Sequence, residues 1–216
     1  MSRPSLLTAS ADPHEVLFRH FNVLKPSLLP TEIPATIDLS VLRAPHTIPG
    51  TPLPTHVLFV ESHFSSAAPL LLPIHSGLYA ANFRTDFPAV GTSLLPVMNP
   101  STHTLKVPVI PFSVPHPPTL PLLFLFALGL EPSPHTELAY RLLPPSVVEE
   151  FPNSAAMAAV LARVAGLETV VERNEGMWRN VLALGVSEGK VVELVGTVWS
   201  VTKEARRIRE RSQDSG

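Results

Sequence analysis

Histidine is the residue type of this chain best suited to chemistry, and all nine histidines lie before residue 136. Without cysteine, a zinc site would need three or four imidazole or carboxylate ligands brought together from separate loops. No His-Glu-x-x-His sequence occurs, few carboxylates lie nearby, and pairs such as His56/His63 are too far apart for adjacent helical turns. We therefore predict no metal site. A small metal-dependent enzyme that uses this histidine-rich part stays as the alternative.

Hydrolytic and nucleotide chemistry also lack their usual patterns. There is no Gly-x-Ser-x-Gly turn, and the neighbours Ser62–His63 and His75–Ser76 are not placed for one side chain to deprotonate the other. The ten glycines form no phosphate-binding loop. The carboxylate pair Glu149–Glu150 is typical of a solvated surface. We predict no catalytic residue, no cofactor and no small-molecule substrate.

The chain finishes in a basic run, Lys203–Arg211, whose charges are spaced for pairing along one helix. Arg206 and Glu210 stand at i, i+4, and Glu204 and Arg207 stand at i, i+3. No aromatic residues alternate with the arginines and the net charge is −2, so we predict no direct binding of nucleic acid. A nuclear-import patch or a contact with an acidic partner are the functions left for this run.

The composition is that of a folded domain, with 216 residues of which 45% are hydrophobic and 16% are charged. The absence of cysteine fits a reducing compartment, so we expect an intracellular protein, nuclear or cytoplasmic. The most apolar stretch, Leu120–Leu130, is much shorter than the roughly 20 residues that a membrane span needs. The N-terminus has no signal-peptide pattern. We expect no membrane association.

Proline divides the chain, because all 25 prolines lie between Pro4 and Pro152 and the segment 153–216 has none. The pattern predicts a proline-rich segment over 1–54 with one short helix, which Asp12 caps and Pro13 begins. It predicts a small α+β module over 55–152 and an all-helical extension over 153–216.

Within the module, the spacing of apolar residues predicts a strand hairpin, a helix, a third strand and a buried helix. Their ranges are 56–60, 69–72, 74–83, 105–110 and 119–130. Pro108 cannot donate to a ladder, so the third strand is expected at a sheet edge. Three further helices, beginning near Ser154, Leu167 and Ser187, are expected in the extension.

This order of elements resembles a BTB/POZ domain. The matching segments are Thr55–Val60, Pro73–His75 leading to Leu78–Ala81, Leu105–Ile110, and a later frame of Pro117, Leu120, Leu122, Leu123, Phe126 and Gly129. His56 stands where that family has an acid, and Leu128 stands where it has a tyrosine.

The wider layout is a proline-rich front, this module, and a helical end with the sequence Asn174–Trp178 and an arginine-rich finish. It resembles the clampless family of mushroom-forming fungi, which regulates dikaryon and clamp-cell development. The resemblance implies a non-catalytic intracellular regulator that acts through protein partners.

We therefore expect an α+β protein–protein interaction module that binds regulators or a second copy of itself. A purely structural helper in a larger assembly is a further option. Tryptophan is enriched at protein interfaces, and the expected edge strand offers apolar side chains. The predicted partner-binding residues are Leu105, Val107, Val109, Trp178, Trp199, Arg206 and Arg207.

Overall fold

The computed structural model describes residues 5–8, 10–27, 30, 32–62, 69–87, 95–131 and 134–214. The strands are β1 (Thr36–Ser40), β2 (His56–Ser62), β3 (Leu70–Ile74), β4 (Val97–Asn99) and β5 (Thr104–Val114). The helices are α1 (Pro13–His20), α2 (Ser76–Asn82), the 3-10 turn η1 (Pro117–Thr119), α3 (Leu120–Ala127), α4 (Pro134–Leu142), α5 (Pro145–Val148), α6 (Ser154–Ala162), α7 (Leu167–Leu184) and α8 (Gly189–Asp214). The fold class is α+β, as predicted.

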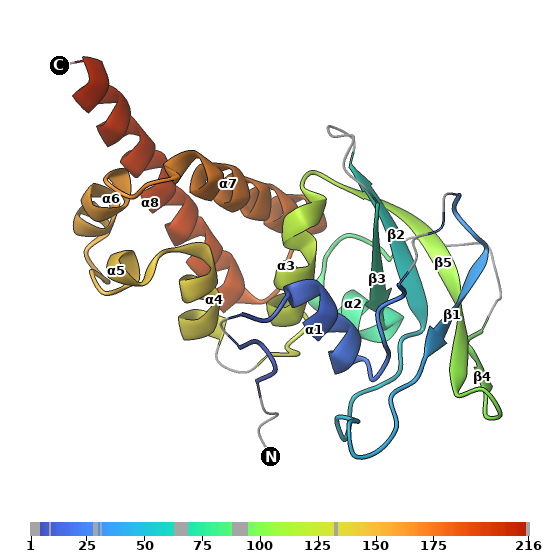
Figure 1. Ribbon diagram of the computed structural model, residues 1–216. Helices are drawn as coiled ribbons and strands as arrows, with labels where there is room; N and C mark the ends of the chain where they lie inside the picture. The colour runs from blue at the N-terminus through green and yellow to red at the C-terminus, as the bar shows by residue number, and fades with distance from the viewer. Residues whose placement is uncertain are drawn as a thin grey trace.

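The molecule has a sheet at one end and a layer of helices at the other (Figure 1). α1 and α3 lie between the sheet and the later helices, and α8 crosses that layer and extends outward at the C-terminus. The order of the paired strands is β1-β5-β2-β3, with β4 also paired to β5. β2 and β3 form the predicted antiparallel hairpin, while β2 and β5 run parallel.

β5 is the central strand, so the prediction of an edge strand is wrong. Its first half pairs with β1 on one side and β4 on the other, and its second half pairs with β2. The Val109 amide donates to the Ala35 carbonyl at 3.1 Å on the β1 side, so the Pro108 nitrogen faces the opposite side. There the pairing with β4 stops at Lys106 and that with β2 starts at Val109. Pro108, which has no amide hydrogen to donate, therefore faces the gap between the end of β4 and the start of β2.

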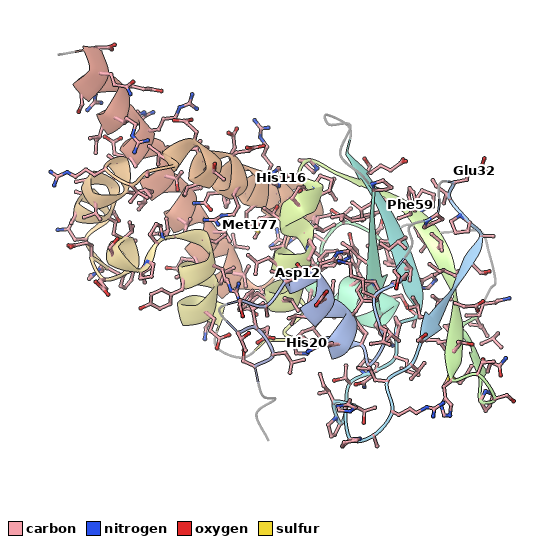
Figure 2. All side chains as sticks on the ribbon, viewed as in Figure 1. Asp12, His20, Glu32, Phe59, His116 and Met177 are labelled. Atoms are coloured by element: carbon pink, nitrogen blue, oxygen red, sulfur yellow. The ribbon has the colours of Figure 1, made fainter. Side chains whose placement is uncertain are left out.

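The segment 1–54 contributes to the same core as the predicted module. β1, which the sequence pattern did not predict, pairs with β5, and α1 packs against α3 and β3. The predicted start of α1 is confirmed, because Asp12 Oδ1 accepts from the His14 amide at 3.0 Å and Pro13 is the first helical residue. Asp12 and His20 mark the two ends of this helix in Figure 2.

α3 is the predicted buried helix, and each of its eight residues is buried. It packs against α1 and α7 and so joins the sheet to the helical layer. An aromatic cluster packs the end of α2 against α3. The ring centre of Tyr79 lies 4.6 Å from that of Phe83, and the ring centre of Phe83 lies 5.4 Å from that of Phe124.

The three predicted C-terminal helices are present as α6, α7 and α8. Asn153, rather than Ser154, caps α6 by accepting from the Ala156 amide at 3.1 Å. Gly185 ends α7 in the left-handed conformation with φ of 60°. α8 packs against α4, α6 and α7, and its Thr202 hydroxyl accepts from Asn174 of α7 at 3.0 Å in the buried interface.

Candidate interaction site

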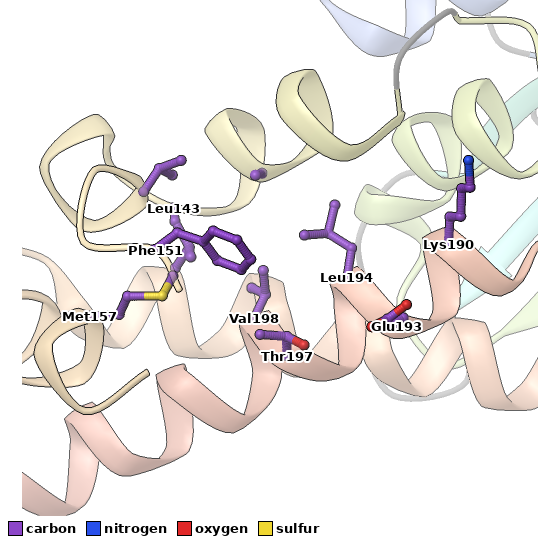
Figure 3. Close-up of a pocket in the computed structure, with 10 residues that line it drawn as sticks. Leu143, Phe151, Met157, Lys190, Glu193, Leu194, Thr197 and Val198 are labelled. Carbon is purple, nitrogen blue, oxygen red and sulfur yellow. The ribbon is translucent and has the colours of Figure 1, made fainter. Parts of the chain in front are cut away.

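An apolar groove of about 460 Å³ lies among α4, α5, α6 and α8 (Figure 3). Most of its walls are apolar side chains, and a smaller set on α8 is polar or charged. The lining residues are Ala139, Leu143, Val148, Phe151, Met157, Lys190, Glu193, Leu194, Thr197 and Val198. We call this feature the α8 groove.

One face of α8 supplies half of the groove. Its lining residues stand at positions i, i+3, i+4, i+7 and i+8, which fall on one side of an α-helix. They are Lys190, Glu193, Leu194, Thr197 and Val198. The wall is therefore continuous over about 12 Å, since a helix rises about 1.5 Å per residue.

Prolines build the opposite wall by turning the chain sharply. Pro144 precedes α5, Pro145 begins it, and the Val148 amide donates back to the Pro144 carbonyl at 3.2 Å. The Phe151 amide then donates to the Val148 carbonyl at 3.1 Å. This compact turn places Leu143, Val148 and Phe151 opposite α8.

Phe151 is the side chain that makes the groove a candidate site. It is 67% exposed, and Figure 3 shows its ring directed across the groove toward α8. Covering an exposed aromatic ring is favourable, at about 25 cal/mol for each Å² of apolar surface removed from water. Of the described lining residues only Lys190 and Glu193 carry charge, so the arrangement is suited to holding an apolar segment with polar neighbours.

The predicted strand contacts do not fit the structure. Leu105, Val107 and Val109 are exposed by only 3%, 0% and 5%, because β5 is interior and these side chains belong to the core. A buried side chain of this kind cannot meet a partner while the fold is intact.

The two tryptophans are half-buried and pack against the core. A Cβ atom at Gly196 of α8 would stand 3.4 Å from the Trp178 ring, so this ring lies at the crossing of α7 and α8. The Lys203 Nζ lies 5.5 Å from the centre of the Trp199 ring. Neither ring lines the α8 groove, and their contact with a partner stays a prediction.

The basic run is paired as its spacing predicts. Arg206 contacts Glu210 at 3.0 Å and Arg207 contacts Glu204 at 3.4 Å, all on the exposed surface. Arg209 instead bonds to the end of α6, because its Nη2 donates to the carbonyl of Ala162, the last residue of that helix, and to that of Val164 just beyond it. A partner contact by Arg206 and Arg207 stays a prediction.

The described histidines lie in several separate parts of the structure, with His56 and His75 as a neighbouring pair. His14 Nε2 lies 2.7 Å from the Leu71 carbonyl, and burial lowers the pKa of His14. His20 Nε2 lies 2.7 Å from Glu131 Oε1, and both side chains are fully buried. Among the described residues, no three histidine, aspartate or glutamate side chains are grouped to hold a metal ion. Within the same part of the chain, no helix has the length and apolar composition needed to cross a membrane.

Comparison with known proteins gives one match. The family model described as the Clampless protein 1 N-terminal domain matches residues 7–115, which is just over half of the chain. The chain belongs to this family. No curated protein and no solved structure matches it.

The clampless match runs from the residues before α1 to the end of β5, so it covers the whole sheet. The α8 groove lies entirely beyond the matched residues. Membership in the clampless family confirms the predicted family resemblance and is consistent with a role in developmental regulation.

The sequence pattern did not identify the groove. Phe151 directly follows Glu149–Glu150, which were interpreted as a solvated surface, and its neighbour in space, α8, begins only at Gly189, after two further helices. The sequence held one signal of the groove, the apolar pair Leu194 and Val198 of α8. Leu194 stands outside the buried face of that helix, so its apolar side chain is free to line a groove.

Proposed function

We propose that this clampless-family protein is a non-catalytic developmental regulator that works by binding a partner protein in the α8 groove. The observation that carries the proposal is the position of Phe151, which is 67% exposed at the rim of an apolar groove of about 460 Å³. A large aromatic side chain beside a concave apolar surface is a common binding hot spot.

The partner segment that fits best is a short amphipathic helix. The α8 wall is about 12 Å long, which matches two turns of a docked helix with apolar residues at i and i+3 or i+4. Lys190 and Glu193 are both exposed on this wall. A partner helix with one acidic and one basic side chain beside its apolar stripe would pair with both charges.

The element order β2, β3, α2, β5 and α3 supports a BTB/POZ-like character for residues 55–130. Under this proposal the sheet half is a scaffold, because the strand side chains once expected at the surface are buried, and the helical half binds the partner. We propose an intracellular location, nuclear or cytoplasmic, for this activity.

Site-specific photo-crosslinking tests the proposal. A benzophenone amino acid at Phe151, introduced in the native host, should crosslink to an apolar segment of another protein. The matched control is Leu182 on α7, which is 60% exposed and does not line the groove. Phe151→Ser should abolish co-purification of the crosslinked protein, whereas Leu182→Ser should retain it.

The outcomes separate the candidate occupants. Crosslinks to a mapped amphipathic helix of another protein, lost in Phe151→Ser, support the proposal. Crosslinks to a second copy of this chain would show that the groove serves self-association, and would overturn the proposal of a different partner protein. Equal crosslinking from positions 151 and 182, or none from either, would overturn the assignment of the groove.

A further inference from the structure

A second cavity, of about 420 Å³, lies where the clampless-matched part meets the C-terminal helices. Its walls come from the start of α1, from η1 and α3, from α4 and from α7. The lining residues are Pro13, His116, Pro118, Thr119, Leu122, Arg141, Thr169, Glu172 and Arg173. We call it the junction cavity. Unlike the α8 groove, it has polar or charged side chains at six of its nine described lining residues.

Two guanidinium groups in this lining have no carboxylate partner among the described residues. Arg141 donates to the backbone carbonyls of Thr8 and, at 3.4 Å, Ala11. Arg173 Nη2 donates to the Leu142 carbonyl at 2.7 Å. These acceptors are neutral, so they satisfy hydrogen-bonding capacity without neutralising either positive charge.

Arg173 is the more unusual of the two. Its side chain is half-buried, and burial lowers the pKa of the guanidinium, because a charge withdrawn from water without a counter-ion is disfavoured. Its Nε is buried and has no acceptor in the part of the chain that the structure describes. A buried N–H group without an acceptor lowers the free energy of unfolding.

The charges of the lining add to a net positive value. Glu172 is the carboxylate of the described lining and is exposed, so it offsets one guanidinium and leaves the other uncompensated. The hydroxyl groups of Thr119 and Thr169 add neutral hydrogen-bonding capacity. Planar guanidinium groups bind phosphate through two parallel hydrogen bonds, which gives such a site both affinity and geometry.

We propose that the junction cavity binds a phosphate monoester through Arg141 and Arg173. The dianionic phosphate would supply the negative charge that the lining lacks and would accept hydrogen bonds from the guanidinium Nη groups of the two arginines. The cavity, at about 420 Å³, is more than ten times the roughly 30 Å³ that a water molecule occupies in the liquid. It therefore has room for an organic group beside the phosphate. Its apolar residues, Pro13, Pro118 and Leu122, would then contact the organic part of the ligand.

This inference goes beyond the proposed partner groove and is independent of it. Arg141 already holds the segment before α1, and Arg173 holds the end of α4. A ligand shared by both arginines would therefore fasten the clampless-matched part to the helices that form the α8 groove.

Titration calorimetry of the full chain tests the proposal, with free phosphoserine, a short phosphoserine peptide, inorganic phosphate and acetate at constant ionic strength. Phosphoserine or its peptide should bind more tightly than inorganic phosphate, and acetate should bind weakest. Stronger binding of the peptide would indicate a phosphorylated protein segment as the source, and stronger binding of the amino acid would indicate a small metabolite.

Substitutions identify the site. Arg173→Gln and Arg141→Gln should each weaken phosphoserine binding about tenfold or more, the loss typical of a charge-assisted hydrogen bond. Arg163→Gln removes an exposed arginine that does not line the cavity, and binding should persist. If Arg173→Gln does not fold, the native chain still gives an answer through the side-chain NMR signal of the Arg173 Nε–H group.

That signal should shift on adding phosphoserine and should stay in place on adding acetate. An unshifted Arg173 signal, equal affinity for acetate, or equal weakening by Arg163→Gln would each overturn the proposal.

Discussion

The imidazole ring of His116 lies directly on the backbone of Gly176, so close that a Cβ atom at Gly176 would stand 2.2 Å from the ring Cγ. This contact is where the chain leaves β5 and meets α7. Asn180 holds it in place, because the His116 amide donates to Asn180 Oδ1 at 3.0 Å and Asn180 Nδ2 donates to the His116 carbonyl at 2.7 Å. The contact explains a glycine in the middle of α7, where it costs about 1 kcal/mol relative to alanine.

Gly176→Ala should lower the free energy of unfolding by about 1–2 kcal/mol, because overpacking outweighs the gain in helix propensity. Urea unfolding measures the change. Gly189→Ala is the control, since a Cβ atom there would meet nothing within 4 Å, and it should cost nothing. A Gly176→Ala protein as stable as the native chain would contradict the close contact.

Asn180→Ala should destabilise the protein by about 2–4 kcal/mol, because it leaves the His116 amide without its acceptor and removes the bond from Asn180 Nδ2 to the His116 carbonyl, which keeps only its bonds from Thr119. Thr119 Oγ1 would lose a third bond, of 3.0 Å, from Asn180 Nδ2. Asn99→Ala, at the exposed end of β4, should cost less than about 1 kcal/mol. Equal losses from the two substitutions would show that the hydrogen bonds between Asn180 and His116 contribute no more to stability than an exposed side chain does.

The buried pair His20 and Glu131 predicts a loss of stability in acid. Burial alone would raise the pKa of Glu131, but hydrogen bonds from the His20 ring and the Leu6 amide lower it below the ordinary value of 4.5. The stabilisation is therefore complete above pH 4.5 and is lost as the pH falls through the lower, folded-state pKa.

Glu131→Ala should cost about 3–5 kcal/mol at neutral pH, as expected for breaking a buried pair. The difference from the native chain should shrink below pH 4.5. Unfolding free energies measured from neutral to acidic pH test this, and a difference that is independent of pH would refute it.

Arg209→Gln should loosen α6, because the guanidinium donates to the Ala162 carbonyl at 2.7 Å and to that of Val164 at 2.5 Å. Amide hydrogen exchange should become faster over residues 154–164, with a cost of about 1–2 kcal/mol. Arg206→Gln is the control, since Arg206 pairs only with Glu210 on its own helix in the described structure. Unchanged exchange in Arg209→Gln would falsify this role.

Local chemistry made much of the fold predictable. The cap at Asp12, the breaker prolines and the apolar periodicity of α7 and α8 are short-range signals, and each is confirmed. The continuous apolar runs over residues 56–60 and 69–72 likewise identified the hairpin.

Features that depend on distant pairing were not predictable in this way. β1 is a short strand among prolines, and its pairing with β5 joins residues such as Leu39 and Leu105. The central place of β5 depends on which partner faces Pro108, which no local pattern records. The α8 groove and the junction cavity likewise combine side chains from elements far apart in the chain.

The central position of β5 also bears on how the chain is made. When synthesis has reached residue 103, the hairpin of β2 and β3 is the part of the described sheet that has both of its strands. A lone two-stranded hairpin is at best marginally stable in water. The sheet can close only after Thr104–Val114 leaves the ribosome, and β5 must then pair with β1 across the whole intervening hairpin, a non-local topology that folds slowly. Chaperones that shield apolar strands should therefore engage this protein during translation, before its central strand exists.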